Sequence, residues 1–299
     1  MVFFGDGQNV PLSKGIAATL KTTAIYPEVT VFSDGERRVR LKLEVLNEDV
    51  VFLKSASITP NVDSLVVETT FIIDALRRSG AKSVTGIFPH FPYSRGDHLF
   101  GVGEAVPLEV VIRMFESAGL TKVLFVDPHT VKISEMFAIP SVNVSAHSLF
   151  SKKIKSLGFN EKDSILVSPD NGGLRRVKAL SETLKNAPYI ALEKNRNHTT
   201  GKIKFGKLNE KVAPNCYIVD DEIAGGGTVL KAMEILKQSG AKNIFVFATH
   251  AVFSGKAPQL LQKSEASKII VTDSIPVGKD KHFRKLEVIS LASIIGQKL

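Results

Sequence analysis

Short runs of apolar residues alternate with longer amphipathic segments along most of this chain of 299 residues. The short runs have the length and the uninterrupted apolar character of strands that are buried on both faces. They lie at 50–53, 84–88, 122–126, 164–168 and 189–192. The amphipathic segments, in which apolar positions recur at helical spacing, lie at 65–78, 106–118 and 174–186. Strands that alternate with helices of about 12 residues predict an α/β fold with mostly parallel sheets flanked by helices.

A duplication divides the chain into two parts. The tetrapeptide Ser-Gly-Ala-Lys at 79–82 recurs at 239–242, and a short apolar strand follows both copies. At the same offset His90 corresponds to His250, and Tyr93 corresponds to Phe253. A shared pattern of this length indicates two related domains. We expect them at 1–140 and 141–299, with the last helix able to pack back on the first domain, and with ligands beyond the carboxyl ends of the strands.

The stretch 217–230 combines a short buried strand, two carboxylates, a glycine-rich turn and the start of a helix. The apolar run stops at Asp220 and Asp221, as a strand does when its end opens into a crevice. Glycines let the backbone approach a ligand, and the following helix points its free N–H groups at the turn. The turn consists of Ala224, Gly225, Gly226, Gly227 and Thr228. It is either a phosphate-binding turn that leaves the carboxylates for hydroxyls or Mg²⁺, or an ordinary solvated strand-to-helix turn.

An aromatic residue and two acidic residues surround a second turn, at 31–40. The alternation of apolar residues from Val39 to Val45 predicts that this turn opens into an edge strand. Phe32 either packs under the turn or stacks on a nucleobase. In the second case Asp34 and Glu36 can accept hydrogen bonds from an amino group of the base. The residues by themselves leave both interpretations open.

Charged residues also follow three other predicted strands. Arg95 and Asp97 lie in a proline-interrupted loop after 84–88, where an arginine can bind phosphate through two parallel hydrogen bonds. His129 follows the strand 122–126, and Asp170 follows the strand 164–168. A loop arginine of this kind is equally well a solvated surface group.

The polar segment 193–202 has little that could pack, so we expect an exposed, mobile loop. Lys194 and Arg196 lie two residues apart in it. On an extended ribbon this spacing places both cations on one side. The pair is either a binding element or a simple contribution to solubility.

The composition is that of an ordinary globular protein, with 43% apolar and 23% charged residues. No apolar run approaches the roughly 18 residues of a membrane span. The formal charge of +9 suits an anionic partner. Because the basic residues are dispersed, phosphorylated metabolites are favoured over nucleic acid. Cys216 is the single cysteine, and the first residues lack a signal-peptide pattern, so we expect a cytoplasmic protein.

Taken together, these motifs resemble those of the ribose-phosphate diphosphokinases, also called phosphoribosyl-diphosphate synthetases, over nearly the whole chain. Residues 32–36 resemble the family's Phe-Pro-Asp-Gly-Glu adenine loop, 93–97 its Tyr-Ala-Arg-Gln-Asp, and 127–129 its Asp-Leu-His. Residues 168–173 match its Ser-Pro-Asp-x-Gly-Gly, 194–196 the Lys-x-Arg of its catalytic loop, and 219–228 its ribose-5-phosphate loop. The short segment after Asp97 looks more like archaeal members than like the longer bacterial and animal ones.

The chain departs from this family pattern at three positions. Gly96 stands where the family usually has Gln, which removes or relocates one contact to the nucleotide. Ala224 and Gly225 stand where it often has Thr or Ser, so the backbone has to do more of the phosphate binding.

The resemblance implies two tandem phosphoribosyltransferase-type domains that transfer the β,γ-diphosphoryl group of ATP to the 1-hydroxyl of ribose 5-phosphate, with Mg²⁺ as cofactor. It assigns ATP binding to Phe32, Asp34, Glu36, Arg95, Asp97 and His129. It assigns ribose 5-phosphate to Asp220, Asp221 and the turn 224–228. It assigns metal binding to His129 and Asp170, and catalysis to Lys194, Arg196 and His129. It also implies a homo-oligomer, a dimer or higher, with no nucleic-acid or membrane partner.

Two alternatives share parts of the pattern. A phosphoribosyltransferase shares the loop at 219–228, but it needs no adenine loop, no second domain and no Lys-x-Arg. A non-catalytic regulatory homologue keeps the fold and tends to lose the catalytic-loop cations, both of which this chain retains.

Overall fold

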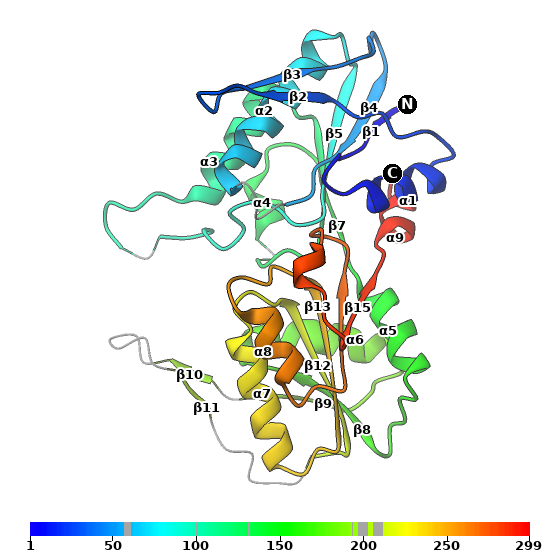
Figure 1. The fold of residues 1–299 in the computed structure, drawn as a ribbon, viewed down its shortest axis with the longest axis vertical. Helices are drawn as coiled ribbons and strands as arrows, with labels where there is room; N and C mark the ends of the chain where they lie inside the picture. The colour runs from blue at the N-terminus through cyan, green and yellow to red at the C-terminus, as the bar shows by residue number, and fades with distance from the viewer. Residues whose placement is uncertain (57–60, 100, 131, 193, 197–202, 206–211) are drawn as a thin grey trace. The chain divides into compact units, whose positions relative to one another are not determined.

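The computed structural model describes residues 1–56, 61–99, 101–130, 132–192, 194–196, 203–205 and 212–299. The chain forms two compact units (Figure 1). The first unit comprises Met1–Ser145, Ser274–Pro276 and Ser290–Leu299, and the second comprises Ala146–Asp273 and Val277–Ile289. The C-terminal segment therefore returns to the first unit, where helix α9 (Ala292–Gly296) packs beside α1 (Val10–Thr19).

The first unit is built on a five-stranded sheet in the order β1-β4-β5-β6-β7, and every neighbouring pair is parallel. Its strands are β1 (Val2–Phe4), β4 (Asp49–Leu53), β5 (Ser83–Phe88), β6 (Lys122–Val126) and β7 (Ser141–Val144). The remaining helices are α2 (Val62–Arg78), α3 (Pro107–Ala118) and α4 (Ile133–Met136). Phe88 anchors the core, because it stacks on Phe115 at a centroid distance of 5.3 Å and meets Phe52 edge-on at 5.7 Å.

The second unit has a six-stranded parallel sheet in the order β15-β14-β13-β12-β8-β9. Its strands are β8 (Ser164–Ser168), β9 (Tyr189–Ala191), β12 (Asn215–Glu222), β13 (Asn243–His250), β14 (Lys268–Thr272) and β15 (Leu286–Ile289). Its helices are α5 (His147–Ser156), η1 (Asn171–Gly173), α6 (Leu174–Thr183), α7 (Gly227–Gln238), α8 (Ala257–Lys263) and η2 (Lys279–Lys281). The expected α/β architecture with mostly parallel sheets flanked by helices is therefore confirmed, and none of the described helices has the length and apolar character of a membrane span.

Each unit also carries a small antiparallel hairpin. In the first unit β2 (Glu28–Val31) pairs with β3 (Arg37–Arg40), and in the second β10 (Lys194–Arg196) pairs with β11 (Ile203–Phe205). The segment 193–202 was expected to be a loop, but residues 194–196 form a strand. Residues 193 and 197–202 lie outside the described part of the chain.

Two predicted boundaries are wrong. The strand expected to run to Val45 ends at Arg40. The apolar positions beyond it do not share one buried face, because Val45 is buried in the core while Leu43 is 44% exposed. The helix expected to reach residue 186 ends at Thr183, because Lys185 and Asn186 adopt left-handed backbone conformations, with φ of 61° and 64°, that cannot continue a helix.

The duplication is visible in the backbone. Tyr93 and Phe253 both have positive φ, of 58° and 45°, although neither is glycine. The order of elements is also shared: β1, α1, β2–β3, β4, α2 and β5 correspond to β8, α6, β10–β11, β12, α7 and β13. An isolated parallel bridge between Phe4 and Ile25 stands where β9 pairs with β8 in the second unit. The loops after β1 and β4 are therefore the counterparts of the loops after β8 and β12.

Candidate active site

Asp220 and Asp221 lie near the carboxyl end of β12, in the middle of the second sheet. The side chains of the residues before them, 216–219, are fully buried, and the strand pairs with β8 on one side and β13 on the other. This burial favours a central strand at that position. The strand does not stop at Asp220 as the pattern suggested, because Asp220 and Glu222 still pair with Ala248 and His250 of β13. The two carboxylates are nevertheless at the edge where ligands of parallel sheets bind.

Arg176 of α6 reaches both carboxylates. Its Nη1 lies 3.5 Å from Oδ1 of Asp220, and its Nη2 lies 3.5 Å from Oδ2 of Asp221. Burial raises the pKa of Asp220 well above its usual value, as do the charge of Asp221 and a hydrogen bond with its side chain, while Arg176 acts in the opposite direction. Ionising both carboxylates therefore costs free energy, and a bound cation or a set of hydroxyl donors can offset that cost.

Sequence reasoning missed Arg176. Arg176 stands in the first turn of α6, three residues after Gly173, and Arg175 precedes it. The only available signal was that α6 begins at the carboxyl end of β8, next to the end of β12. Two consecutive arginines on a helix are usually exposed to solvent, so this signal was weak.

The glycine-rich turn forms an open cradle at the start of α7. Gly226 is the N-cap in the left-handed conformation, with φ of 79°, which glycine adopts without strain. No side chain of the described residues caps α7, and its first turn has no acidic residue. Apart from its chain neighbours and its own helix, a Cβ added at Gly227 would meet no atom of the described residues within 4 Å, so the start of α7 borders open space in this part of the structure. Free N–H groups at a helix start, together with the helix dipole, are suited to a phosphate.

Backbone hydrogen bonds hold this turn in place. The N–H of Ile223 donates to the carbonyl of His250 at 2.9 Å, and the N–H of Phe253 donates to the carbonyl of Ile223 at 2.9 Å. The N–H of Ser254 then donates to the carbonyl of Ala224 at 3.1 Å. The turn is thus fixed to the end of β13, and a ligand that binds there needs little ordering of the protein.

Asp170 follows β8 and caps the short helix η1. Its Oδ1 accepts a hydrogen bond from the N–H of Gly173 at 3.3 Å, while the Ser168 hydroxyl donates to its carbonyl at 2.6 Å. A Cβ at Gly173 would lie only 2.5 Å from the Ser168 Oγ, so a larger residue there would force the Ser168 hydroxyl out of its present position. The carboxylate is partly exposed at the same edge of the sheet as Asp220.

In the first unit, Phe32, Asp34 and Glu36 lie at the tip of the β2–β3 hairpin. The N–H of Phe32 donates to the carbonyl of Glu36 at 2.8 Å, and the Asp34 Oδ1 accepts from the N–H of Glu36 at 3.0 Å. Phe32 is 43% exposed and the Arg38 guanidinium lies 5.6 Å from its ring centroid, so Phe32 does not pack under the turn. Its exposed ring is available for stacking.

Arg95 and Asp97 lie in the loop after β5, and His129 lies in the loop after β6. Burial alone would raise the pKa of Asp97, but hydrogen bonds from His98 and Thr130 outweigh it and hold that pKa below its usual value. The contact with Thr130 brings Asp97 next to the segment that carries His129. Arg95 and His129 are both exposed.

Lys194 and Arg196 occupy β10, where Lys194 pairs with Phe205 and Arg196 with Ile203. Their side chains lie outside the described structure. The hairpin is joined to the sheet through segments that contain residues 193 and 206–211, which are also outside it.

Within the described residues, no group of three or more His, Cys, Asp or Glu side chains surrounds a metal position. Mg²⁺ rarely needs such a cage, because it keeps several waters and binds through one or two carboxylates together with substrate phosphates. The partly exposed carboxylate of Asp170 fits that sparse mode. The exposed imidazole of His129, in the first unit, is a less typical Mg²⁺ ligand.

Comparisons with known proteins cover the chain from end to end. Residues 1–119 match the N-terminal domain of ribose phosphate pyrophosphokinase, and residues 161–299 match the phosphoribosyl synthetase-associated domain. Ribose-phosphate pyrophosphokinase 2 of Enterococcus faecalis is 32% identical over 296 residues, which cover 99% of this chain and 91% of the relative. Ribose-phosphate pyrophosphokinase of Vibrio parahaemolyticus is 32% identical over 301 residues, with 100% and 95% covered.

A solved structure agrees with the sequence relatives. The crystal structure of phosphoribosylpyrophosphate synthetase from Mycobacterium smegmatis superimposes with a TM-score of 0.89 at 29% identity, and the match covers 99% of this chain and 96% of that one. The match therefore includes both units of this chain, whereas a single-domain transferase would match only one of them. By its fold, its two matched domains and its full-length relatives, the chain belongs to the ribose-phosphate pyrophosphokinase family.

Proposed function

We propose that this chain transfers the β,γ-diphosphoryl group of ATP to ribose 5-phosphate. The 1-hydroxyl oxygen of the sugar attacks the β-phosphorus, the bond between that phosphorus and the α,β-bridging oxygen breaks, and AMP leaves. The hydroxyl proton is released, and 5-phosphoribosyl 1-diphosphate is the product. Such a transfer depends mostly on alignment and on neutralising charge.

The observation that carries this proposal is the arrangement at the end of β12. Two carboxylates held by Arg176 lie beside a helix start whose N–H groups border open space. Ribose 5-phosphate has matching chemistry, with two vicinal hydroxyls that donate hydrogen bonds and a phosphate. Asp220 and Asp221 would take the 2- and 3-hydroxyls, and residues 224–228 would take the 5-phosphate.

ATP is assigned to the first unit. Phe32 would stack on adenine, and Asp34 and Glu36 would accept hydrogen bonds from its amino group. Arg95 would face the triphosphate, with Asp97 and His129 nearby. His129 would meet the triphosphate partly through Mg²⁺, and Asp170 of the second unit would hold Mg²⁺ directly or through water. When it is bound, Mg²⁺ supplies neutralisation of the phosphate charges.

Lys194 and Arg196 would offset the charge that develops on the transferred group. One well-placed cation of this kind contributes on the order of 3–4 kcal/mol, or roughly 10²- to 10³-fold in rate. Lys194→Ala should therefore lower kcat far more than it raises KM. An equal change in both, or an unchanged kcat, would remove Lys194 from the catalytic role.

The proposal includes a homo-oligomer, a dimer or higher, in a reducing cytoplasm. Light scattering coupled to gel filtration measures the first part, and a monomeric mass at working concentration would contradict it. The retained Lys194 and Arg196 favour an active enzyme over a regulatory homologue.

Incubation of the purified chain with Mg²⁺, ATP and ribose 5-phosphate tests the activity directly. AMP should appear only when the sugar phosphate is present, and Lys194→Ala/Arg196→Ala should abolish it. If the wild type binds ATP without releasing AMP, the regulatory alternative replaces this proposal.

A further inference from the structure

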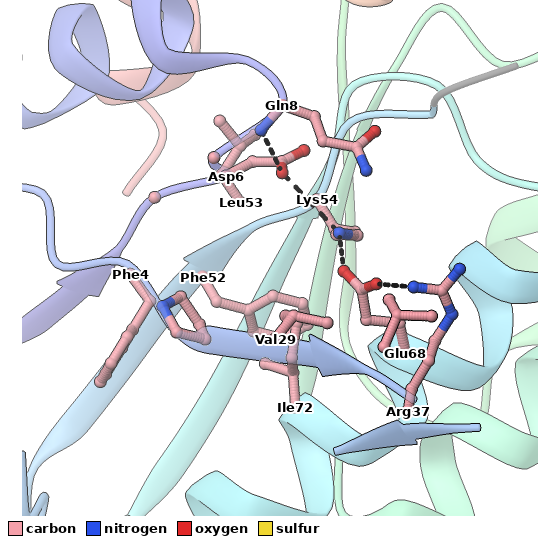
Figure 2. A pocket seen from close by; sticks show the side chains of 14 residues that line it. Phe4, Asp6, Gln8, Val29, Arg37, Phe52, Leu53, Lys54, Glu68 and Ile72 are labelled. Carbon is pink, nitrogen blue, oxygen red and sulfur yellow. Dashed lines mark hydrogen bonds and ion pairs between the residues drawn. The ribbon is translucent and has the colours of Figure 1, made fainter. Parts of the chain in front are cut away.

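A cavity of about 350 Å³ opens in the first unit, between the β2–β3 hairpin and the carboxyl ends of β1 and β4. Figure 2 shows two contrasting sides. Phe4, Phe52, Val29 and Ile72 gather on one, and a row of polar side chains lies along the other. Small-molecule sites of about 300–1,000 Å³ are lined mainly by apolar groups with a few placed polar ones. This cavity is at the small end of that range.

By the duplication, the position of the cavity in the first unit corresponds to that of the proposed ribose site in the second. Lys54 and Ser55 follow β4 just as Asp220 and Asp221 close β12. Asp6 follows β1 just as Asp170 follows β8. The first unit thus keeps a pocket where the second has its proposed ribose site, but it has a cation in place of the acidic pair. A different ligand is needed to match it.

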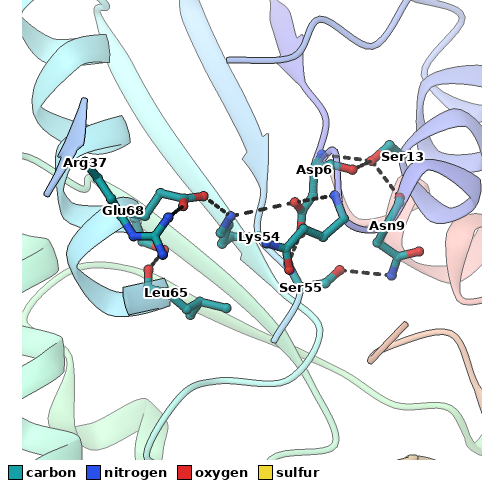
Figure 3. Close-up of polar contacts among 10 residues, drawn as sticks. Asp6, Asn9, Ser13, Arg37, Lys54, Ser55, Leu65 and Glu68 are labelled. Atoms are coloured by element: carbon teal, nitrogen blue, oxygen red, sulfur yellow. Dashed lines mark hydrogen bonds and ion pairs between the residues drawn. The ribbon is translucent and has the colours of Figure 1, made fainter. Parts of the chain in front are cut away.

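The polar side is an alternating row of charges, seen in Figure 3. The Lys54 Nζ donates to Oε1 of Glu68 at 2.6 Å, and the Arg37 Nη1 donates to Oε2 of Glu68 at 3.3 Å. All three side chains are nearly buried, with exposures of 5%, 9% and 12% for Lys54, Glu68 and Arg37. In hydrogen-bonding terms, the row reads donor, acceptor, donor.

Asp6 lies at the end of the row, and each of its two carboxylate oxygens accepts a hydrogen bond from the backbone. Its Oδ2 accepts from the N–H of Ser55 at 2.8 Å, and its Oδ1 accepts from the N–H of Gln8 at 3.0 Å. The Lys54 Nζ lies 3.7 Å from Asp6, which is beyond hydrogen-bond reach. Within the described part of the chain, the Lys54 ammonium therefore makes a single hydrogen bond and has two N–H donors left, in a nearly buried position where donors are normally satisfied.

The net charge of the row argues against a phosphate. Two cations are balanced by the carboxylates of Asp6 and Glu68, so a multiply charged anion would meet two buried negative groups without a net counter-charge. A neutral planar ring suits the apolar side. An edge that presents acceptor, donor and acceptor in turn complements Lys54, Glu68 and Arg37.

We propose that this cavity binds a neutral oxo-heterocycle with an imide edge, in which a ring N–H lies between two carbonyls, as in uracil or its nucleoside. The two carbonyls accept from Lys54 and Arg37, and the ring N–H donates to Glu68. The volume admits a base or nucleoside, whereas a nucleoside triphosphate is too large and too charged. This binding does not depend on the proposed function.

Calorimetric titration of the full chain with uracil, uridine, 3-methyluracil, adenine and inorganic phosphate tests the proposal. Uracil or uridine should bind with one site per chain, while 3-methyluracil, which lacks the N–H, should bind at least about tenfold more weakly. Adenine, which has no ring carbonyl, should be comparably weak. No detectable binding of uracil and uridine, or preferred binding of phosphate, would overturn the proposal.

Two variants locate the site. Lys54→Met should lower uracil affinity about tenfold or more, but it also leaves two carboxylates less compensated and can impair folding. Gly7→Leu avoids that difficulty, because Gly7 lines the cavity and a Cβ there meets no atom within 4 Å. Its matched control is Gly101→Leu, at an exposed glycine outside the cavity whose Cβ, among the described residues, would meet the Glu104 side chain. Loss of binding in Gly7→Leu alone supports the site, and equal affinity in both variants refutes it.

A ligand in this cavity would touch the hairpin that carries Phe32, because Val29 and Arg37 belong to its two strands. Saturating uracil should therefore change KM for ATP by linkage. This second readout rests on the proposed function. Calorimetry without substrates does not, so failure of the activity and failure of the binding site are distinguishable.

Discussion

Gly226 and Gly227 are neighbours at the start of α7, and alanine at each should have opposite effects on stability. Gly226 has φ of 79°, a conformation in which a side chain costs roughly 1–2 kcal/mol. The nearest atoms to an added Cβ lie 3.7–3.8 Å away, which is ordinary contact, so the cost comes from the backbone alone. Gly226→Ala should lower the free energy of unfolding by that amount, and the melting temperature by about 2–4 °C per kcal/mol.

Gly227 has an ordinary helical backbone and open space around its Cβ position. Gly227→Ala should raise the free energy of unfolding by about 0.4–1 kcal/mol, because alanine restricts the unfolded chain. The added methyl group would occupy the space in which the N–H groups of α7 meet the 5-phosphate. A lost charge-assisted hydrogen bond contributes about 1.5–3 kcal/mol, so KM for ribose 5-phosphate should rise roughly 10- to 100-fold.

Urea unfolding and steady-state kinetics on both variants measure these effects. Gly240→Ala is the matched control, since Gly240 also has positive φ, of 98°, but lies beyond the other end of α7. It should lose stability like Gly226→Ala and keep its KM. If Gly227→Ala is more stable and has an unchanged KM, the phosphate cradle is wrongly placed. If it loses as much stability as Gly226→Ala, the backbone argument fails.

Three further predictions concern the second unit. Arg176→Met should raise KM for ribose 5-phosphate about tenfold or more, because it leaves Asp220 and Asp221 without their shared cation, and Arg176→Lys should recover part of the loss. Unchanged kinetics in Arg176→Met would exclude this positioning role. Because the pKa of Asp220 is raised in the folded state, its ionisation lowers stability as pH rises from about 4 through the raised value. The melting temperature of Asp220→Asn relative to wild type should therefore increase with pH, and a difference independent of pH would contradict this. Burial raises the pKa of the Cys216 thiol to about 12, so Ellman's reagent at pH 8 should label it only after unfolding. Rapid labelling of the native chain would show that Cys216 is accessible.

The architecture could be predicted because buried parallel strands have a strong signature. Apolar runs as short as 122–126 and 164–168 strongly favour buried strands. The recurring Ser-Gly-Ala-Lys ends α2 and α7 with the same hydrogen bonds. In both cases a glycine with positive φ stops the helix, at Gly80 and at Gly240.

Features that depend on tertiary contacts could not be predicted. The alternation from Val39 to Val45 looked like a strand, but the burial of Val45 reflects packing against the core and not sheet pairing. The row formed by Arg37, Lys54 and Glu68 joins residues of β3, the end of β4 and α2, which are consecutive in the chain but meet only through tertiary contacts. No local sequence pattern predicts it. Arg176 was missed for the same reason, because only the fold brings α6 to the end of β12.

The measurement that tests the central claim most directly follows the label from two preparations of ATP in the presence of Mg²⁺ and ribose 5-phosphate. With ATP labelled at the γ-phosphate, the label should appear in 5-phosphoribosyl 1-diphosphate, and with ATP labelled at the α-phosphate it should appear in AMP, in equal amounts. Release of the γ-label as inorganic phosphate, transfer of the α-label to the sugar, or ATP binding without any transfer would contradict diphosphoryl transfer by this chain.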